Sequence, residues 1–276
     1  MDSRRETFPT GRARLKLRNP SGDVRIETKE TDETTVELVS LNDSDATRQA
    51  IERASIRARG DEVFVEVEGR SWSISIGNWG ITSPKVGVWI TCPVGSELEC
   101  DTASADLKVD GTLGDTRVRT ASGDLTLDRT EGTLELKTAS GDAQIEQVSG
   151  RAQVSTVSGD VSIREAQGGL SVNSVSGDVI ADEVTGDLSI SSVSGDQIVR
   201  AAGPGELALK AVSGDVVVAI RRGLRVRLDV NSVSGSIGSE LEVSDTPVSS
   251  DVPEARLRAR TVSGDVKISR AAEAIA

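Results

Sequence analysis

The side chains that could do chemistry in this sequence are carboxylates and hydroxyls that recur at regular intervals. A Ser-Gly-Asp motif appears eight times, and five successive copies stand at a strict interval of eighteen residues. The glycines and aspartates of these copies are Gly123 and Asp124, Gly141 and Asp142, Gly159 and Asp160, Gly177 and Asp178, and Gly195 and Asp196. A row of carboxylates could bind calcium, because calcium prefers oxygen ligands.

Calcium-binding β-rolls differ from this pattern in detail. In their nonapeptide repeat the aspartate stands two residues after a glycine in every half-turn. Here the aspartate follows the glycine directly and occurs mainly in alternate halves. We therefore expect each aspartate to accept hydrogen bonds from the backbone of its own turn and to face water, as aspartate does in turns generally. No metal or cofactor site is predicted, and calcium stays the open alternative.

Nothing in the sequence indicates catalysis. The chain has no histidine, so no imidazole can activate a serine as a nucleophile. Because the repeat places carboxylates everywhere, it singles out no acid and base pair for glycoside cleavage. Two cysteines without histidine do not make a zinc site, and we expect Cys92 and Cys100 to be reduced thiols that pack in the core. The chain is predicted not to be an enzyme.

Charge and composition limit the partners. The formal net charge is -12, and aromatic residues make up 2% of the chain. Nucleic-acid binders need a basic face or stacking platforms, so nucleic acid is not expected. No apolar run approaches the roughly 20 residues that span a bilayer, and no apolar segment of a secretory signal follows the basic start. We expect a cytoplasmic protein, with envelope association or export by another route left open.

The best candidates for a specific contact are the three tryptophans, Trp72, Trp79 and Trp89, which fall within eighteen residues. They could bind a partner or a carbohydrate. They could also plug an open end of the fold, because terminal repeats need atypical caps. We favour the plug.

The elements that position these residues follow from the glycine period. Glycines stand nine residues apart at ten successive positions from Gly114 to Gly195. Between them the apolar residues are spaced as in Leu170, Val172 and Val175, which predicts one short strand and one turn per half-repeat. The glycine takes a bend that needs positive φ or a close backbone approach.

The fold class predicted is therefore all-β, a single-stranded parallel β-solenoid with eighteen residues per coil in two nine-residue halves. A left-handed helix of hexapeptides would need apolar residues every six positions, and the preference for right-handed crossovers favours right-handed winding. Gln197 occupies an inward slot. Either the strand slips to turn Ile198 inward or an amide intrudes into the core.

The first hundred residues are expected to form a β-rich cap with a short helix. Strands are predicted at 13–17, 24–27, 35–39 and 63–67, and a helix at 45–54 after Ser44 and Asp45 as caps. The domain boundaries we expect are 1–100 for the capping region, 101–270 for the solenoid repeats and 271–276 for a C-terminal tail.

The repeats resemble a large bacterial family of unknown biochemical function, whose members carry Ser-Gly-Asp β-strand repeats and are described as candidate adhesins. The resemblance covers roughly residues 11–270, including NPSGDVRIET, VWITCPVGSELECDTASADLKVDG and the TASGD and TVSGD turns. It implies a β-solenoid without known catalytic residues, with some relatives linked to envelope stress or surface display.

The function expected is that of a non-enzymatic scaffold or protein-interaction module. Exposed coil ends could also stack on one another, which makes self-association a second possibility. The alternative is an envelope-associated or surface module that binds carbohydrate or another ligand through the tryptophan segment.

Overall fold

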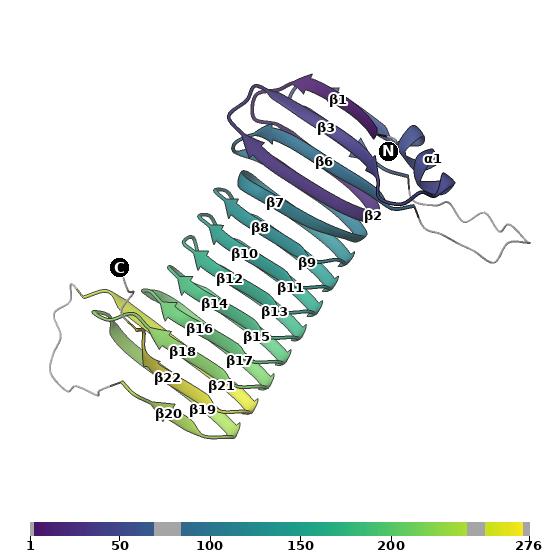
Figure 1. Cartoon of the computed structure of the whole chain (residues 1–276). Coiled ribbons are helices and arrows are strands. Elements are labelled where there is room, and N and C mark those ends of the chain that lie inside the picture. The colour runs from purple at the N-terminus through teal and green to yellow at the C-terminus, as the bar shows by residue number, and fades with distance from the viewer. Residues whose placement is uncertain (1–2, 69–83, 242–251, 273–276) are drawn as a thin grey trace, which may run out of the picture. The chain divides into compact units, whose positions relative to one another are not determined.

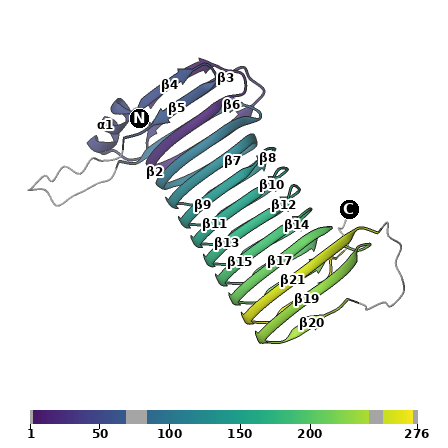
Figure 2. The ribbon, with the colours of Figure 1, turned by 180° about the vertical axis from the view of Figure 1, so that it is seen from behind.

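The computed structural model describes residues 3–68, 84–241 and 252–272. Within these ranges the chain is almost entirely β-structure with one helix, as predicted. It divides into two compact units, Met1–Gly141 and Asp142–Ala276. Figures 1 and 2 show both units from opposite sides.

The second unit consists of two ladders of parallel strands, and each coil contributes one strand to each ladder (Figure 1). In the regular coils from β10 to β16, strands of one ladder pair with an offset of eighteen residues, so that Val161 faces Val179 and Leu170 faces Leu188. The first ladder contains β11 (Ala152–Ser158), β13 (Leu170–Ser176), β15 (Leu188–Ser194), β17 (Gly205–Ser213), β21 (Glu254–Ser263) and β19 (Arg225–Ser234). The second contains β10 (Ala143–Val148), β12 (Val161–Ala166), β14 (Val179–Val184), β16 (Gln197–Ala202), β18 (Val216–Ile220), β22 (Val266–Arg270) and β20 (Ile237–Ser239).

The last coils are not stacked in sequence order. Strand β21 pairs with β17 on one side and with β19 on the other, and β22 likewise lies between β18 and β20. The coil formed by β19 and β20 is therefore the terminal coil of the second unit, although β21 and β22 follow it in the chain. Figure 2 shows β21 between β17 and β19.

The core of the second unit consists of small and branched apolar side chains that alternate along each strand. Val161, Ile163 and Ala166 are fully buried, as the nine-residue spacing predicts. The nine-residue spacing groups Val175 with the buried Leu170 and Val172, but Val175 is 48% exposed and Ser174 is buried instead. Strict alternation continues from Leu170 to the corner, so position 174 points inward and 175 points outward.

Gln197 enters the core without a slip of its strand. It is fully buried and stays in register with Val179 and Val216. Its Nε2 donates hydrogen bonds to the hydroxyl of Ser192 at 2.8 Å and to the carbonyl oxygen of Lys210 at 2.7 Å. Of the two predicted alternatives, the intruding amide is therefore the one observed, as a single residue.

The corner glycines adopt the conformation that the motif predicts. Their φ angles are +145° at Gly123, +115° at Gly141, +132° at Gly159, +114° at Gly177 and +120° at Gly195. A Cβ on Gly195 would lie 2.2 Å from the carbonyl oxygen of Gly177 in the neighbouring coil. Both the positive φ and the close approach of coils therefore require glycine.

Two long bent strands are central to the first unit. They are β2 (Arg14–Lys29) and β7 (Ser96–Ser122). Residues 14–27 of β2 pair in parallel with residues 97–110 of β7, so the predicted strands at 13–17 and 24–27 form two sides of one coil. The next coil contains β8 (Leu125–Thr130) and β9 (Leu134–Ser140), which pair with later parts of β7.

Parallel strands flank β2 in the first unit, and the strands beyond them pair antiparallel. Strand β6 (Val86–Pro93) pairs with β2, then β3 (Glu33–Ser40) and β1 (Ser3–Pro9) continue that side. On the other side, β5 (Glu62–Glu66) pairs with β2, and β4 (Ser55–Arg59) pairs with β5. The helix α1 (Asp45–Arg53) confirms the predicted helix, and the Ser44 hydroxyl accepts from the N–H of Thr47 at 3.2 Å. The boundary proposed at residue 100 stays a prediction.

Candidate functional site

The aspartates of the motif form a hydrogen-bonded ladder along the corner of each unit. In the second unit Asp160 accepts through Oδ1 from the N–H of Asp178, and Asp178 accepts from the N–H of Asp196, both at 2.8 Å. The same bond joins Asp142 to Asp160, Asp196 to Asp215 and Asp215 to Asp265, and in the first unit Asp106 to Asp124. The prediction that each carboxylate binds its own turn is wrong. Each accepts from the next coil, because the parallel stack places that N–H directly against it.

The ladder of the second unit ends where its sequence pattern ends. Asp265 accepts from the N–H of Ser236 at 2.7 Å, and this bond lowers the pKa of the Asp265 carboxyl. Ser236 stands where the other motif copies carry aspartate. Its coil is the terminal one in the described stack, so no following coil offers a backbone N–H that a carboxylate at position 236 could accept from. This position explains the one Ser-Gly-Ser copy.

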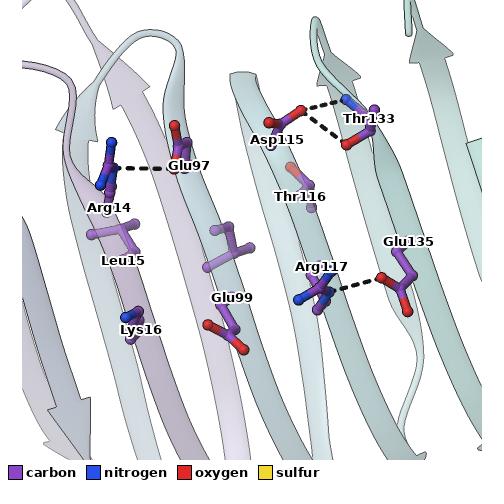
Figure 3. Close-up of a pocket in the computed structure, with 11 residues that line it drawn as sticks. Arg14, Leu15, Lys16, Glu97, Glu99, Asp115, Thr116, Arg117, Thr133 and Glu135 are labelled. Atoms are coloured by element: carbon purple, nitrogen blue, oxygen red, sulfur yellow. Dashed lines mark hydrogen bonds and ion pairs between the residues drawn. The ribbon is translucent and has the colours of Figure 1, made fainter. Parts of the chain in front are cut away.

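A charged groove of about 240 Å³ lies on the first unit, over β2, β7 and β9 (Figure 3). Arg14 lies 3.4 Å from Glu97, and Arg117 lies 2.8 Å from Glu135. Asp115 accepts from the N–H and the hydroxyl of Thr133 at 2.7 and 2.9 Å, and the backbone bond is the main cause of its lowered pKa. These groups pair with one another across neighbouring strands. The groove is smaller than typical ligand pockets and is best explained as rows of surface ion pairs.

A second groove on the first unit, of about 340 Å³, surrounds Trp89. The ring is 37% exposed, because Trp89 alternates with the buried Val88 and Ile90 and so points outward from β6. The expectation that it plugs an end of the fold is wrong for Trp89. Trp72 and Trp79 lie outside the described residues.

Charged and hydroxyl side chains flank the indole in register. Arg25 of β2 and Glu37 of β3 lie on either side of Trp89, and the guanidinium carbon of Arg25 is 5.8 Å from the ring centroid. Arg5 of β1 follows Glu37 in the same row. An exposed indole beside hydrogen-bonding groups is the arrangement that contact sites favour. Sequence reasoning found Trp89 but missed its flanking residues, because the pairing of β6 with β2 and β3, and of β3 with β1, was not known.

A row of exposed valines crosses the first ladder of the second unit, and we call it the valine row. Each member stands directly before the motif serine, at the same position of successive strands. The exposed fractions are 53% at Val157, 48% at Val175, 50% at Val193, 50% at Val212, 50% at Val262 and 77% at Val233. Sequence reasoning missed this row. The invariant valine of the TVSGD and AVSGD copies was the available signal.

The two cysteines are buried, as predicted, and both thiols are free. Burial raises the pKa of Cys92 to about 11, with a partly opposing hydrogen bond from Ser96, and raises that of Cys100 further. Among the described residues, no three carboxylate or cysteine side chains gather as a bound metal would require. No described helix has both the length and the apolar character that would let it cross a membrane.

Comparison with solved structures gives several proteins of similar extent. An adhesin candidate from Bacteroides fragilis is 14% identical, with 97% of each chain covered and a TM-score of 0.40. An adhesin candidate from Parabacteroides distasonis is 9% identical, with 97% of each chain covered and a TM-score of 0.41. A protein from the same species, named as a candidate lipid-binding protein, is 10% identical over 96% of each chain with a TM-score of 0.47. At these values the likeness supports no statement about function.

No curated protein matches the sequence. A family model does match, over residues 12–269, and its description is Toastrack DUF4097, a domain of unknown function. The matched range includes the bent strands β2 and β7 and every Ser-Gly-Asp corner described above. The chain therefore belongs to the Toastrack DUF4097 family.

Proposed function

We propose that this chain is a non-enzymatic scaffold and protein-interaction module, and that the valine row is its contact surface. The observation that carries the proposal is the exposure of an apolar side chain at one position of six adjacent strands. With strands about 4.8 Å apart, the row extends about 24 Å. A continuous apolar strip of this kind marks an interaction site more often than isolated surface valines do.

Strand propensity alone does not account for the valines. The same position of the motif holds Ala103, Ala121 and Ala139 in the first unit, where the side chains are also exposed. The backbone at the corner therefore does not require a β-branched residue. The difference between alanine and valine at this position supports a role for the larger side chain outside the fold.

The side chains beside the valine row indicate which groups a partner would present to it. The exposed motif serines follow the valines directly, and the aspartate ladder runs parallel to them two residues further on. The ladder bonds of Asp160 and Asp178 are accepted by Oδ1. A protein partner would place apolar side chains on the valines and basic groups toward the carboxylates, because opposite potentials attract across an interface.

Photo-crosslinking tests this proposal in the native cell. A photoreactive amino acid replaces Val193 in one version of the protein and Ser162 in another, because Ser162 lies outward on β12 in the other ladder. We expect a discrete protein adduct from position 193 and none from position 162. An adduct at 162 alone, or no adduct at either position, would contradict the proposal.

A second candidate function is ligand binding at the Trp89 groove, of the kind expected for a surface or envelope module that binds carbohydrate. The exposed indole between Arg25 and Glu37 favours it, since an aromatic face and hydrogen-bonding groups together suit a sugar ring. Binding of cell-surface polysaccharides by the whole chain should fall on Trp89→Ala and not on Phe64→Ala. Equal binding by the Trp89→Ala variant would remove this candidate.

A further inference from the structure

We propose that the terminal coil of the second unit is a homodimer interface, in which β19 pairs antiparallel with β19 of a second copy. This proposal does not depend on the valine contact, although β19 also carries Val233 of the valine row. The first observation is the sheet edge itself. Among the described strands, β19 has β21 as its only hydrogen-bonded neighbour, and β20 has only β22. Both strands therefore present one unpaired backbone edge, which is a template for pairing with another chain.

The core is also open at this coil. Leu228 and Ile237 occupy the inward positions that Leu257 and Val266 occupy in the neighbouring coil, as the register shows. Leu228 is 41% and Ile237 49% exposed, whereas Leu257 and Val266 are each 1% exposed. Apolar side chains that belong to the core thus lack a covering layer. Pairing with a further coil would bury them at about 25 cal/mol for each Å².

The edge strands of the first unit are built differently. Strand β1 carries Arg4, Arg5 and Glu6, and β4 carries Arg57 and Arg59, so charged side chains line both edges. Charges on an edge strand oppose pairing with another chain. Because the two kinds of edge do not match, head-to-tail stacking is disfavoured. Self-pairing of one edge through a two-fold axis, which closes the assembly, is the remaining arrangement.

The sequence of β19 is complementary to itself about Leu228. In an antiparallel pair centred on Leu228, Val226 faces Val230 and Arg227 faces Asp229 of the second copy. Val226 and Val230 lie on the same side of the strand as Leu228, and Arg227 and Asp229 lie on the other. The register therefore creates one apolar pair, Val226 with Val230, and one opposite-charge pair, Arg227 with Asp229, and the symmetry makes each of them twice.

Arg227 and Asp229 can pair across the dimer because the ion pairs that they make within the chain are weak. Arg227 lies 3.5 Å from Glu254, and Asp229 lies 3.7 Å from Arg260, in ion pairs between side chains that are more than half exposed except for Glu254. Exposed pairs of this kind contribute little. The terminal coil also carries Ser236 in place of the ladder aspartate, so the two-fold contact brings no additional carboxylates together.

Charge reversal tests the register. Sedimentation equilibrium of the whole chain should give twice the chain mass of 28.9 kDa. Arg227→Asp and Asp229→Arg each place like charges opposite one another, and each should raise the dimer dissociation constant by about 30-fold. The double variant should restore the dimer. An equimolar mixture of the two single variants should form heterodimers, because the opposite charges then face each other.

A matched control reverses one charge of an ion pair that lies away from the terminal coil. Arg200 and Asp182 form a cross-strand pair on β16 and β14, so Arg200→Asp should leave the dimer intact. Thermal melting of each variant checks that it is folded. A wild-type chain that stays monomeric at every concentration would overturn the inference. Dimers whose dissociation constant is unchanged by both charge reversals would overturn it too, as would growth into filaments. Dimers that form only after residues 242–251 are shortened would also overturn it, because that segment, and not a second copy, would then cover the β19 edge in the full chain.

Discussion

Replacement of Gly195 by alanine should open the stack locally, because the corner has no room for a side chain. The added Cβ would lie 2.2 Å from the carbonyl oxygen of Gly177 and 2.7 Å from its carbon. Contacts of that kind need at least about 3 Å, so the two coils must separate by nearly 1 Å. Separation weakens two flanking bonds, from the N–H of Asp196 to Asp178 and from the N–H of Val179 to the carbonyl of Asp196.

The free energy of unfolding should fall by about 3 to 4 kcal/mol. Two hydrogen bonds contribute about 1 kcal/mol each, and alanine at positive φ costs about 1 to 2 kcal/mol. Gly223→Ala is the matched control, since Gly223 has φ of +78° and a Cβ there would meet nothing within 4 Å. That variant should lose only the smaller backbone contribution.

Hydrogen exchange with mass spectrometry is the appropriate assay, because stability in a repeat array is local and each coil depends on its neighbours. Peptides that cover β14 to β17 should exchange faster in Gly195→Ala, and peptides of the first unit should not change. Urea unfolding followed by circular dichroism gives the magnitude. Equal losses of stability in Gly195→Ala and Gly223→Ala would refute the close-approach argument.

Three further predictions concern the ladder and the buried thiols. Asp178→Ala should cost about 1 kcal/mol in urea unfolding, because the N–H of Asp196 loses its acceptor, whereas Asp178→Asn keeps an acceptor oxygen and should lose less; equal losses would count against the ladder. Because folding lowers the pKa values of Asp115 and Asp265, both carboxylates stabilise the fold fully above the ordinary aspartate pKa, and this stabilisation is lost as pH falls through the lowered values. The melting temperature should therefore fall on acidification, and it should fall less in Asp265→Asn. Cys92 and Cys100 should resist a thiol reagent at about pH 8 until the chain is unfolded, because burial raises both pKa values; rapid labelling of native protein would contradict their packing.

The repeat made the coil predictable from sequence. Nine-residue glycine spacing and alternating apolar residues lead directly to two strands per eighteen residues, and the register of Val161 with Val179 confirms the period. Val175 was misassigned because hydrophobicity was given more weight than strict alternation. The sequence alone does not separate a valine that faces the core from one that faces a partner.

Long-range order was the part that sequence reasoning could not supply. The position of β21 between β17 and β19 reverses the order of two coils, and every coil carries nearly the same motif. Ser236 was the one local sign of a terminal coil, and its meaning depends on knowing that each aspartate binds the next coil. The groove at Trp89 depends on the antiparallel pairing of β3 with β6 and of β1 with β3. A strand was predicted at 35–39, but its neighbours were not, and the charged β1 carries a weak strand signal.

The central claim is that the valine row binds a protein partner, and its most direct test is an affinity measurement. Isothermal titration with the partner crosslinked at position 193 compares the wild type with Val175→Thr/Val193→Thr/Val212→Thr, which keeps side-chain shape and removes apolar surface. Three half-exposed valines at about 1 kcal/mol each predict binding about 100-fold weaker. The control Ser171→Thr/Ser189→Thr/Ala208→Thr, on the same ladder, should bind as the wild type does. Unchanged affinity of the valine variant would contradict the claim.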